Sequence, residues 1–192
     1  MQENAREQGA IERQRLMFNK RFIGATLSKL RLGDGLCKHV AKWIIDPKGF
    51  LVITGEPGTG KTYFCAALVE VLFTPRKSIR YYDERNLFRR LRDGISDGSS
   101  GDYMKHLECL LDDDFIIIDD VGSSGHTEWR EEVLMEAIDL RYRNMKPTVI
   151  TSNLTRKQFY ETYGKRITSR LFAKENLIIS MDGMPDLREE GL

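Results

Sequence analysis

The 192-residue sequence has only three cysteines, Cys37, Cys65 and Cys109, and they lie far apart. Their number and spacing fit neither a disulfide framework nor a zinc site. Cys65 falls in an apolar helical stretch, so we expect it in the core. A chain with so few cysteines suits a reducing compartment, and we expect a cytoplasmic protein.

Histidine is also scarce, and His39, His106 and His126 show no metal-ligand spacing, so we interpret them as structural or surface residues. No apolar run approaches the roughly 20 residues that span a bilayer, and the polar N-terminus is no secretory signal, so we expect no membrane partner. The formal net charge is only +1, so a nucleic-acid site has to be a local patch.

Short apolar runs alternate with helical patterns along the chain, and the length fits one domain with a real core. We expect strands at 50–54, 79–82, 115–119, 148–151 and 177–179. We expect helices at 62–73, 84–93, from 102 to about 111, at 127–143 and, as short pieces, within 155–173, with a mobile Gly/Ser loop at 94–101. Such alternation predicts an α/β fold, a three-layer α/β/α sandwich around a central five-stranded parallel sheet. Residues 1–21 are expected to form a helical arm and residues 22–192 the domain.

One segment matches the phosphate-binding pattern G-x-x-x-x-G-K-[ST] in full. It consists of Gly55, Glu56, Pro57, Gly58, Thr59, Gly60, Lys61 and Thr62, and we add Tyr63 to the cofactor-binding set. The glycines let backbone N–H groups surround an anion, and the dipole of the next helix points at the same place. Lys61 can reach the β- and γ-phosphates, and the Thr62 hydroxyl can ligate Mg²⁺. The motif lies between a strand and a helix and therefore predicts a P-loop NTPase with ATP and Mg²⁺ as cofactors.

Two carboxylates, Asp119 and Asp120, end the apolar strand that begins at Phe115. A P-loop ATPase needs one carboxylate there for the Mg²⁺ shell and another to polarise the attacking water. We assign Asp119 to the metal and Asp120 to the water. An Asp-Asp pair can also start a solvated turn before Gly122, but the upstream P-loop favours the catalytic interpretation.

Asn153 follows the fourth expected strand. Parallel strands present ligand groups at their carboxyl ends, so this amide can lie between the γ-phosphate and the second carboxylate. It can also begin a turn or cap a helix, and we favour the sensor role. Arg166 and Arg170 share one helix face, and one of them can reach a neighbouring subunit's γ-phosphate, although their spacing alone favours two solvated surface arginines.

Taken in order, these motifs resemble the DnaC/DnaI/IstB group of AAA+ ATPases. They are the P-loop, Ile-Ile-Ile-Asp-Asp-Val-Gly at 116–122, Val-Ile-Thr-Ser-Asn-Leu at 149–154 and Arg-Ile-Thr-Ser-Arg-Leu at 166–171. The segment at 21–27, Arg-Phe-Ile-Gly-Ala-Thr-Leu, looks like the start of the same ATPase core. The resemblance covers about residues 20–190 and makes the expected domain an AAA+ core of prokaryotic or phage origin.

Members of this group load the ring-shaped replicative helicase onto DNA or, in the IstB branch, assist a transposase. The resemblance implies Asn153 as sensor 1, Arg170 as a finger acting in trans with Arg166 beside it, and a helical or ring-like oligomer with ATP at its interfaces. Arg188 is a weaker match to the sensor-2 arginine, and a plain tail residue fits as well. Asp120 stands where many AAA+ proteins have glutamate, which allows for slow hydrolysis. About twenty residues precede the core, so we expect a minimal loader of phage type or a different grip on the helicase.

A basic segment at 84–92 is a candidate surface for single-stranded DNA. Arg85, Arg89 and Arg92 lie near one another in a helix, away from the apolar face of Leu87 and Leu91. The resemblance implies DNA contact in this region, where arginines suit the backbone and an exposed aromatic suits base stacking. The alternative is a solvated helix face with Phe88 packed inward.

The sequence therefore favours an AAA+ ATPase that loads the replicative DNA helicase onto single-stranded DNA during replication initiation. One alternative is an IstB-like ATPase that assists a transposase. Another is an adaptor that binds ATP as a switch and hydrolyses it negligibly. A stand-alone nucleotide kinase is disfavoured, because the strand-borne Asn153 and the Ser-Arg-Leu segment suit an oligomeric ATPase better.

Overall fold

The computed structural model of the chain describes residues 8–9, 11–12, 16–30, 32–72, 78–96, 107–108 and 110–187. Strands and helices alternate along these residues, as the sequence predicts. In chain order the elements are η1 (Lys20–Phe22), η2 (Leu27–Lys29), α2 (Asp34–Ile45), β1 (Phe50–Thr54), α3 (Lys61–Leu72), β2 (Ile79–Asp83), α4 (Glu84–Ser96), β3 (Phe115–Val121), α6 (Glu128–Arg143), β4 (Thr148–Ser152), α7 (Arg156–Leu171) and β5 (Leu177–Ser180).

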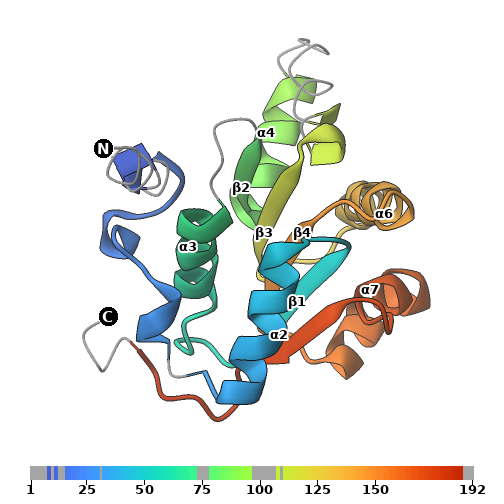
Figure 1. Ribbon diagram of the computed structural model, residues 1–192. Helices are drawn as coiled ribbons and strands as arrows, with labels where there is room; N and C mark the ends of the chain where they lie inside the picture. Colours follow the sequence, from blue (N-terminus) through green and yellow to red (C-terminus); the bar gives the residue numbers. More distant parts are fainter. Residues whose placement is uncertain are drawn as a thin grey trace.

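The five strands form one sheet in the order β2-β3-β4-β1-β5, and every neighbouring pair is parallel. All residues of β1 and β4 are buried, as expected for parallel strands covered on both faces. Helices α2 and α3 pack on one face of the sheet, and α4, α6 and α7 pack on the other (Figure 1). The predicted α/β/α sandwich with a five-stranded parallel sheet is confirmed.

Alternation along the strands supplies a separate apolar core to each face of the sheet. Leu51 and Ile53 of β1 belong to the core beneath α2 and α3, together with Phe64 of α3. Phe50 and Val52 point the other way, into the core shared with α4, α6 and α7. Cys65 is fully buried in the first core, which confirms its predicted core position. This packing fixes the carboxyl ends of the strands, where ligands bind in open α/β sheets.

Element boundaries differ from the expected ones in two informative places. Helix α4 continues to Ser96, into the expected loop at 94–101, whose residues 97–101 lie outside the described part of the chain. Helix α7 is assigned as one element where short helices are expected, and it bends at Gly164, whose φ of 71° interrupts the helical backbone. Residues 107–108 and 110–112 are helical, in line with the helix expected to end near 111.

Part of the expected N-terminal arm, residues 1–7, 10 and 13–15, lies outside the described residues. Phe18 is buried, and its ring lies 4.2 Å from that of Tyr81 on β2, centroid to centroid. The end of the arm therefore packs against the sheet beside the P-loop helix α3. Among the helices of the described segments, none is long and apolar enough to cross a bilayer.

Candidate nucleotide-binding site

The P-loop connects the end of β1 with the start of α3, and its glycines are required by backbone geometry and close approach. Gly58 has φ of 90° and Gly60 has φ of 94°, a region that favours glycine. A Cβ atom at Gly58 would lie 2.2 Å from Asp186 Oδ2, and one at Gly60 would lie 2.4 Å from Leu187 Cδ1. The backbone N–H of Leu187 also donates to the Gly58 carbonyl at 3.0 Å, so the segment after β5 packs directly on the P-loop.

Lys61, the P-loop lysine, is buried at the start of α3. Its Nζ donates to the carbonyls of Gly55 and Glu56, each at 2.7 Å. These bonds hold the ammonium group over the loop, where the N-terminal dipole of α3 also favours an anion.

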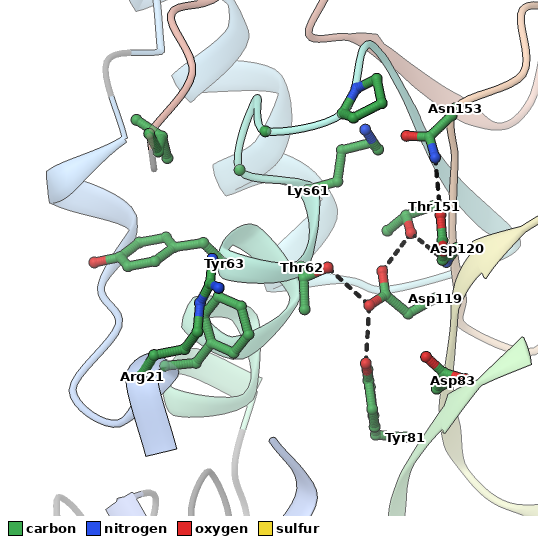
Figure 2. Close-up of a pocket in the computed structure, with 15 residues that line it drawn as sticks. Arg21, Lys61, Thr62, Tyr63, Tyr81, Asp83, Asp119, Asp120, Thr151 and Asn153 are labelled. Atoms are coloured by element: carbon green, nitrogen blue, oxygen red, sulfur yellow. Dashed lines mark hydrogen bonds between the residues drawn. The ribbon is translucent and has the colours of Figure 1, made fainter. Parts of the chain in front are cut away.

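A pocket of about 340 Å³ opens beside this loop, within the size range of small-ligand sites (Figure 2). It lies at the carboxyl edge of the sheet, between the ends of β2, β3 and β4, the P-loop and η1. Its lining residues are Arg21, Phe22, Pro57, Gly58, Gly60, Lys61, Thr62, Tyr63, Tyr81, Asp83, Asp119, Asp120, Thr151, Asn153 and Leu187. The P-loop, both predicted carboxylates and the predicted sensor amide therefore meet in one cavity.

Asp119 is held by three hydroxyl groups and is 4% exposed. Thr62 Oγ1 and Tyr81 OH each donate to Asp119 Oδ2 at 2.8 Å, and Thr151 Oγ1 donates to Oδ1 (Figure 2). Burial raises the pKa of Asp119, the three hydrogen bonds oppose that rise, and the negative charge of Asp120 adds to it. A cation beside this carboxylate would favour its ionised form.

The donor set around Asp119 fits Mg²⁺. This ion prefers oxygen ligands, keeps several waters, and takes only one or two protein ligands beside substrate phosphates. The Thr62 hydroxyl and the Asp119 carboxylate supply such oxygens next to the phosphate loop. Within the described segments, no group of three or more His, Cys, Asp or Glu residues could by itself hold a metal ion.

Asp120 reaches the same cavity because β3 is irregular at this point. Consecutive strand residues normally face opposite sides of a sheet, but the β3–β4 register shifts between Ile118 and Val121. Asp120 has φ of 61°, and its N–H donates to Thr151 Oγ1 at 2.8 Å. Asn153 Nδ2 donates to Asp120 Oδ1 at 3.0 Å. The amide and the second carboxylate thus form a direct pair.

Comparison with known proteins identifies the family. Residues 38–173 match the IstB-like ATP-binding proteins. The chain belongs to this family. The replicative helicase loader DnaC of Escherichia coli (strain K12) is 23% identical over 121 residues, which are 62% of this chain and 49% of DnaC. The chain therefore spans about half the length of this curated relative.

Solved structures agree on the fold of this IstB-like protein. The crystal structure of DnaI has a TM-score of 0.69 at 24% identity and covers 91% of this chain and 98% of its own. The replication initiator DnaA, bound to AMPPCP and single-stranded DNA, has a TM-score of 0.68 at 17% identity, covering 81% of this chain and 49% of DnaA. At these identities the likeness shows the fold. With the family match, it confirms the predicted membership in the DnaC/DnaI/IstB group of AAA+ proteins.

The two arginines of α7 lie apart from the nucleotide pocket of the IstB-like protein. Arg170 Nε forms an ion pair with the Asp139 carboxylate on α6, and Arg166 lies 3.1 Å from the same carboxylate. Arg143 of α6 completes the group at 2.6 Å. Neither Arg166 nor Arg170 is among the described residues that line the pocket. The other predicted arginine, Arg188, lies outside the described residues.

Six lining residues carried no assigned role in the sequence interpretation. They are Arg21, Phe22, Tyr81, Asp83, Thr151 and Leu187. A signal existed for two of them, because Thr151 precedes Asn153 at the end of a strand and Tyr81 lies two residues before the end of β2. Asp83 was missed because the expected strand ended at residue 82, and Arg21, Phe22 and Leu187 depend on how the N-terminal and C-terminal segments fold over the P-loop.

The candidate DNA surface on α4 is only partly as expected. Arg85, Arg89 and Arg92 are exposed, but Phe88 is 2% exposed and packs in the core with Leu87 and Leu91. The expectation of an exposed aromatic for base stacking is therefore wrong. Phe88 faces inward because the ring of Trp129 on α6 packs against it, with centroids 5.8 Å apart.

His39 and His126 are exposed and bond to Gly35 O and Glu131, whereas His106 lies outside the described residues.

Proposed function

We propose that this IstB-like protein is an ATPase that loads a replicative DNA helicase onto single-stranded DNA. The observation that carries the proposal is the pairing of residues in the pocket: Thr62 with Asp119, and Asn153 with Asp120. The first pair suits a metal on the nucleotide, and the second suits a water aimed at the γ-phosphate. The loader role rests on the similarity to DnaC and DnaI.

Five side chains of the pocket have a defined part in the proposed hydrolysis: Lys61, Thr62, Asp119, Asp120 and Asn153. P-loop N–H groups and Lys61 bind the β- and γ-phosphates, for which Lys61 exchanges its bonds to the loop carbonyls. Mg²⁺, held by Thr62 with Asp119 in its shell, would neutralise phosphate charge. Asp120 accepts a hydrogen bond from the attacking water. The Asn153 amide donates a hydrogen bond to Asp120 Oδ1, so the other carboxylate oxygen, Oδ2, is available to that water.

Two further components of the proposal lie outside the pocket. Arg170, with Arg166 beside it, acts on the γ-phosphate bound by a neighbouring copy, so hydrolysis requires self-association. The exposed arginines of α4, Arg85, Arg89 and Arg92, contact the phosphate backbone of single-stranded DNA. Because Phe88 is buried, α4 supplies backbone contacts without base stacking from that ring.

The loader role is tested by mixing the protein with its host's replicative helicase, with and without ATP, and measuring mass by size-exclusion chromatography with light scattering. We expect a co-eluting complex that responds to ATP, and no such response in Lys61→Ala. Lys42→Ala, a change of the same kind at an exposed position on α2, is the matched control. Separate elution of the two proteins under every nucleotide condition would contradict direct loading.

The family match favours a second candidate, an ATPase that assists a transposase, because the matched family is that of the IstB-like proteins. The same chromatography with the transposase encoded nearest to the gene distinguishes the two partners. A third possibility, an ATP-switched adaptor, predicts nucleotide-dependent partner binding without turnover. Phosphate release measured with and without single-stranded DNA separates this adaptor from both ATPases.

A further inference from the structure

Glu84, the first residue of α4, is a buried carboxylate with no part in the chemistry above. It is 1% exposed, so its charge needs partners inside the protein. Gly122 N donates to Oε1 and Ser124 N donates to Oε2, each at 3.0 Å, and Tyr163 OH lies 3.3 Å from Oε1. Glu84 thus joins α4 to the loop after β3 and to α7.

The loop that Glu84 holds begins at Gly122, two residues after Asp120, the carboxylate proposed to orient water. Ser123 N donates to the Asp120 carbonyl at 3.1 Å, which closes a turn directly on that residue. Arg85, the next residue of α4, donates to Ser123 O at 3.3 Å. Through Glu84 and Arg85, the first turn of α4 therefore binds two N–H groups of this loop, those of Gly122 and Ser124, and the carbonyl of Ser123.

The opposite side of the loop is also confined. The side chain of Leu154, which follows β4, lies against the backbone at Gly122. Burial and the negative charge of Glu84 raise the pKa of Tyr163, so its phenol remains a hydrogen-bond donor. Thr151 and Asn153 hold Asp120 itself, and Glu84 holds the loop that follows it.

We propose that Glu84 is a positioning residue for Asp120, and that it links the basic face of α4 to ATP hydrolysis. The inference rests on the proposed ATPase function. Arg85 belongs to the candidate DNA face, where it is exposed, and it also donates a hydrogen bond to the loop at Ser123 O. If a DNA phosphate binds Arg85, Arg85 no longer donates to Ser123 O, and α4 then holds the loop mainly through Glu84. DNA binding would in this way change the position of Asp120.

The decisive variant is Glu84→Gln, which keeps the size of the side chain and replaces one acceptor oxygen by an NH₂ group facing a backbone N–H. We expect kcat for ATP to fall about tenfold or more, because small displacements of a catalytic group are costly. ATP affinity, Mg²⁺ dependence and oligomer mass should remain as in the wild type, and the ratio of DNA-stimulated to basal rate should change. Glu136→Gln, the same substitution at an exposed position on α6, should match the wild type in all of these.

Amide hydrogen exchange provides a readout that does not depend on turnover. The Gly122 and Ser124 amides should exchange faster in Glu84→Gln than in the wild type, with the P-loop amides unchanged. Tyr163→Phe removes one donor and should give a smaller effect of the same kind, which keeps the test available if Glu84→Gln does not fold. Unchanged kcat and unchanged exchange in either folded variant would overturn the inference, as would a fall in kcat explained by weaker ATP binding.

Failure of the wider function is distinguishable from failure of this inference. A wild-type protein that binds ATP but does not release phosphate refutes the ATPase proposal and, with it, the role of Glu84 in positioning Asp120 for hydrolysis. In that case the exchange rates still decide whether Glu84 tethers the loop. An active wild type with an equally active Glu84→Gln variant refutes the role of Glu84 alone.

Discussion

The nucleotide pocket and the arginine cluster between α6 and α7 carry opposite surpluses of charge. In the pocket, Asp83, Asp119 and Asp120 face the cations Lys61 and Arg21. In the cluster, the guanidinium groups of three arginines surround the single carboxylate of Asp139. The pocket thus contains the groups suited to a metal and a water. The cluster has an excess of positive charge and lies outside the pocket lining of its own chain.

The difference indicates where the arginines act. A P-loop ATPase gains from a guanidinium group on the γ-phosphate, and that group can come from the same chain or from a neighbour. Because Arg170 is paired with Asp139 outside the pocket lining, we propose that Arg170, with Arg166 beside it, serves the pocket of a second copy. Asp139 then keeps Arg170 in place on α7 until a phosphate competes for it.

The largest effect is expected from Arg170→Ala. We expect a fall in ATP turnover of roughly 10³-fold, the scale of a lost arginine finger, with nucleotide affinity of the separate chain retained. Phosphate release and titration with a fluorescent ATP analogue measure the two effects. Arg143→Ala removes another partner of Asp139 and serves as the control, with turnover expected near the wild-type value.

Mixing two inactive variants tests action in trans directly. Lys61→Ala lacks the phosphate lysine and Arg170→Ala lacks the finger, so a mixed oligomer contains interfaces with one intact pocket and one intact arginine. Partial recovery of turnover on mixing supports the proposal. If the mixture is as inactive as its components while oligomers still form, Arg170 does not act across an interface.

The linear motifs predicted the phosphate side of the site well, because the P-loop is contiguous and its geometry is local. The carboxyl ends of β3 and β4 were also foreseeable, since parallel strands bring Asp119 and Asn153 to one edge. That Asp120 faces the same cavity as Asp119 was not deducible from strand alternation. It requires the bulge in β3, which depends on pairing with β4.

Features that depend on packing between helices could not be predicted from the sequence. Asp139 gave no signal as the partner of Arg166 and Arg170, because the three residues meet only when α6 packs on α7. The face of α4 was misjudged at Phe88, since the apolar stripe of Leu87 and Leu91 proved wide enough to include it. The contact of Glu84 with the loop after β3 was also not predictable, because it forms only when these elements pack together.

A smaller effect on the pocket side is expected from Asn153→Ala. The change removes the donor to Asp120 Oδ1 and leaves the P-loop and Asp119 untouched, so kcat should fall about tenfold at nearly constant ATP affinity. Asn153→Asp keeps the size of the side chain but sets a negative charge against Asp120, and should reduce kcat further. Steady-state phosphate release checks both variants. Equal kcat in Asn153→Ala and the wild type would remove Asn153 from the proposed mechanism.

The smallest expected effect concerns the stability of the cluster itself. Burial raises the pKa of Asp139, but the charges of Arg170, Arg143 and Arg166 and the hydrogen bond from Arg143 outweigh it, and the net pKa is lowered. A carboxyl whose pKa is lowered by folding stabilises the protein above its unfolded pKa of about 3.9 and loses that contribution as pH falls through the folded pKa. Asp139→Asn should therefore lower Tm at neutral pH and converge with the wild type in acid.

The size of this effect depends on the exposure of the arginines. The Arg170 side chain, whose charge contributes most, is 23% exposed, but those of Arg166 and Arg143 are 65% and 67% exposed, so solvent screens much of their attraction. We expect about 1 kcal/mol, or about 2–4 °C in Tm. Thermal unfolding of both proteins from pH 7 to pH 3 measures the difference. Asp112→Asn, at a 78% exposed side chain paired with Lys146, should change Tm little at any of these values. A gap between Asp139→Asn and the wild type that persists undiminished at pH 3 would mean that the carboxylate charge is not what holds α6 to α7.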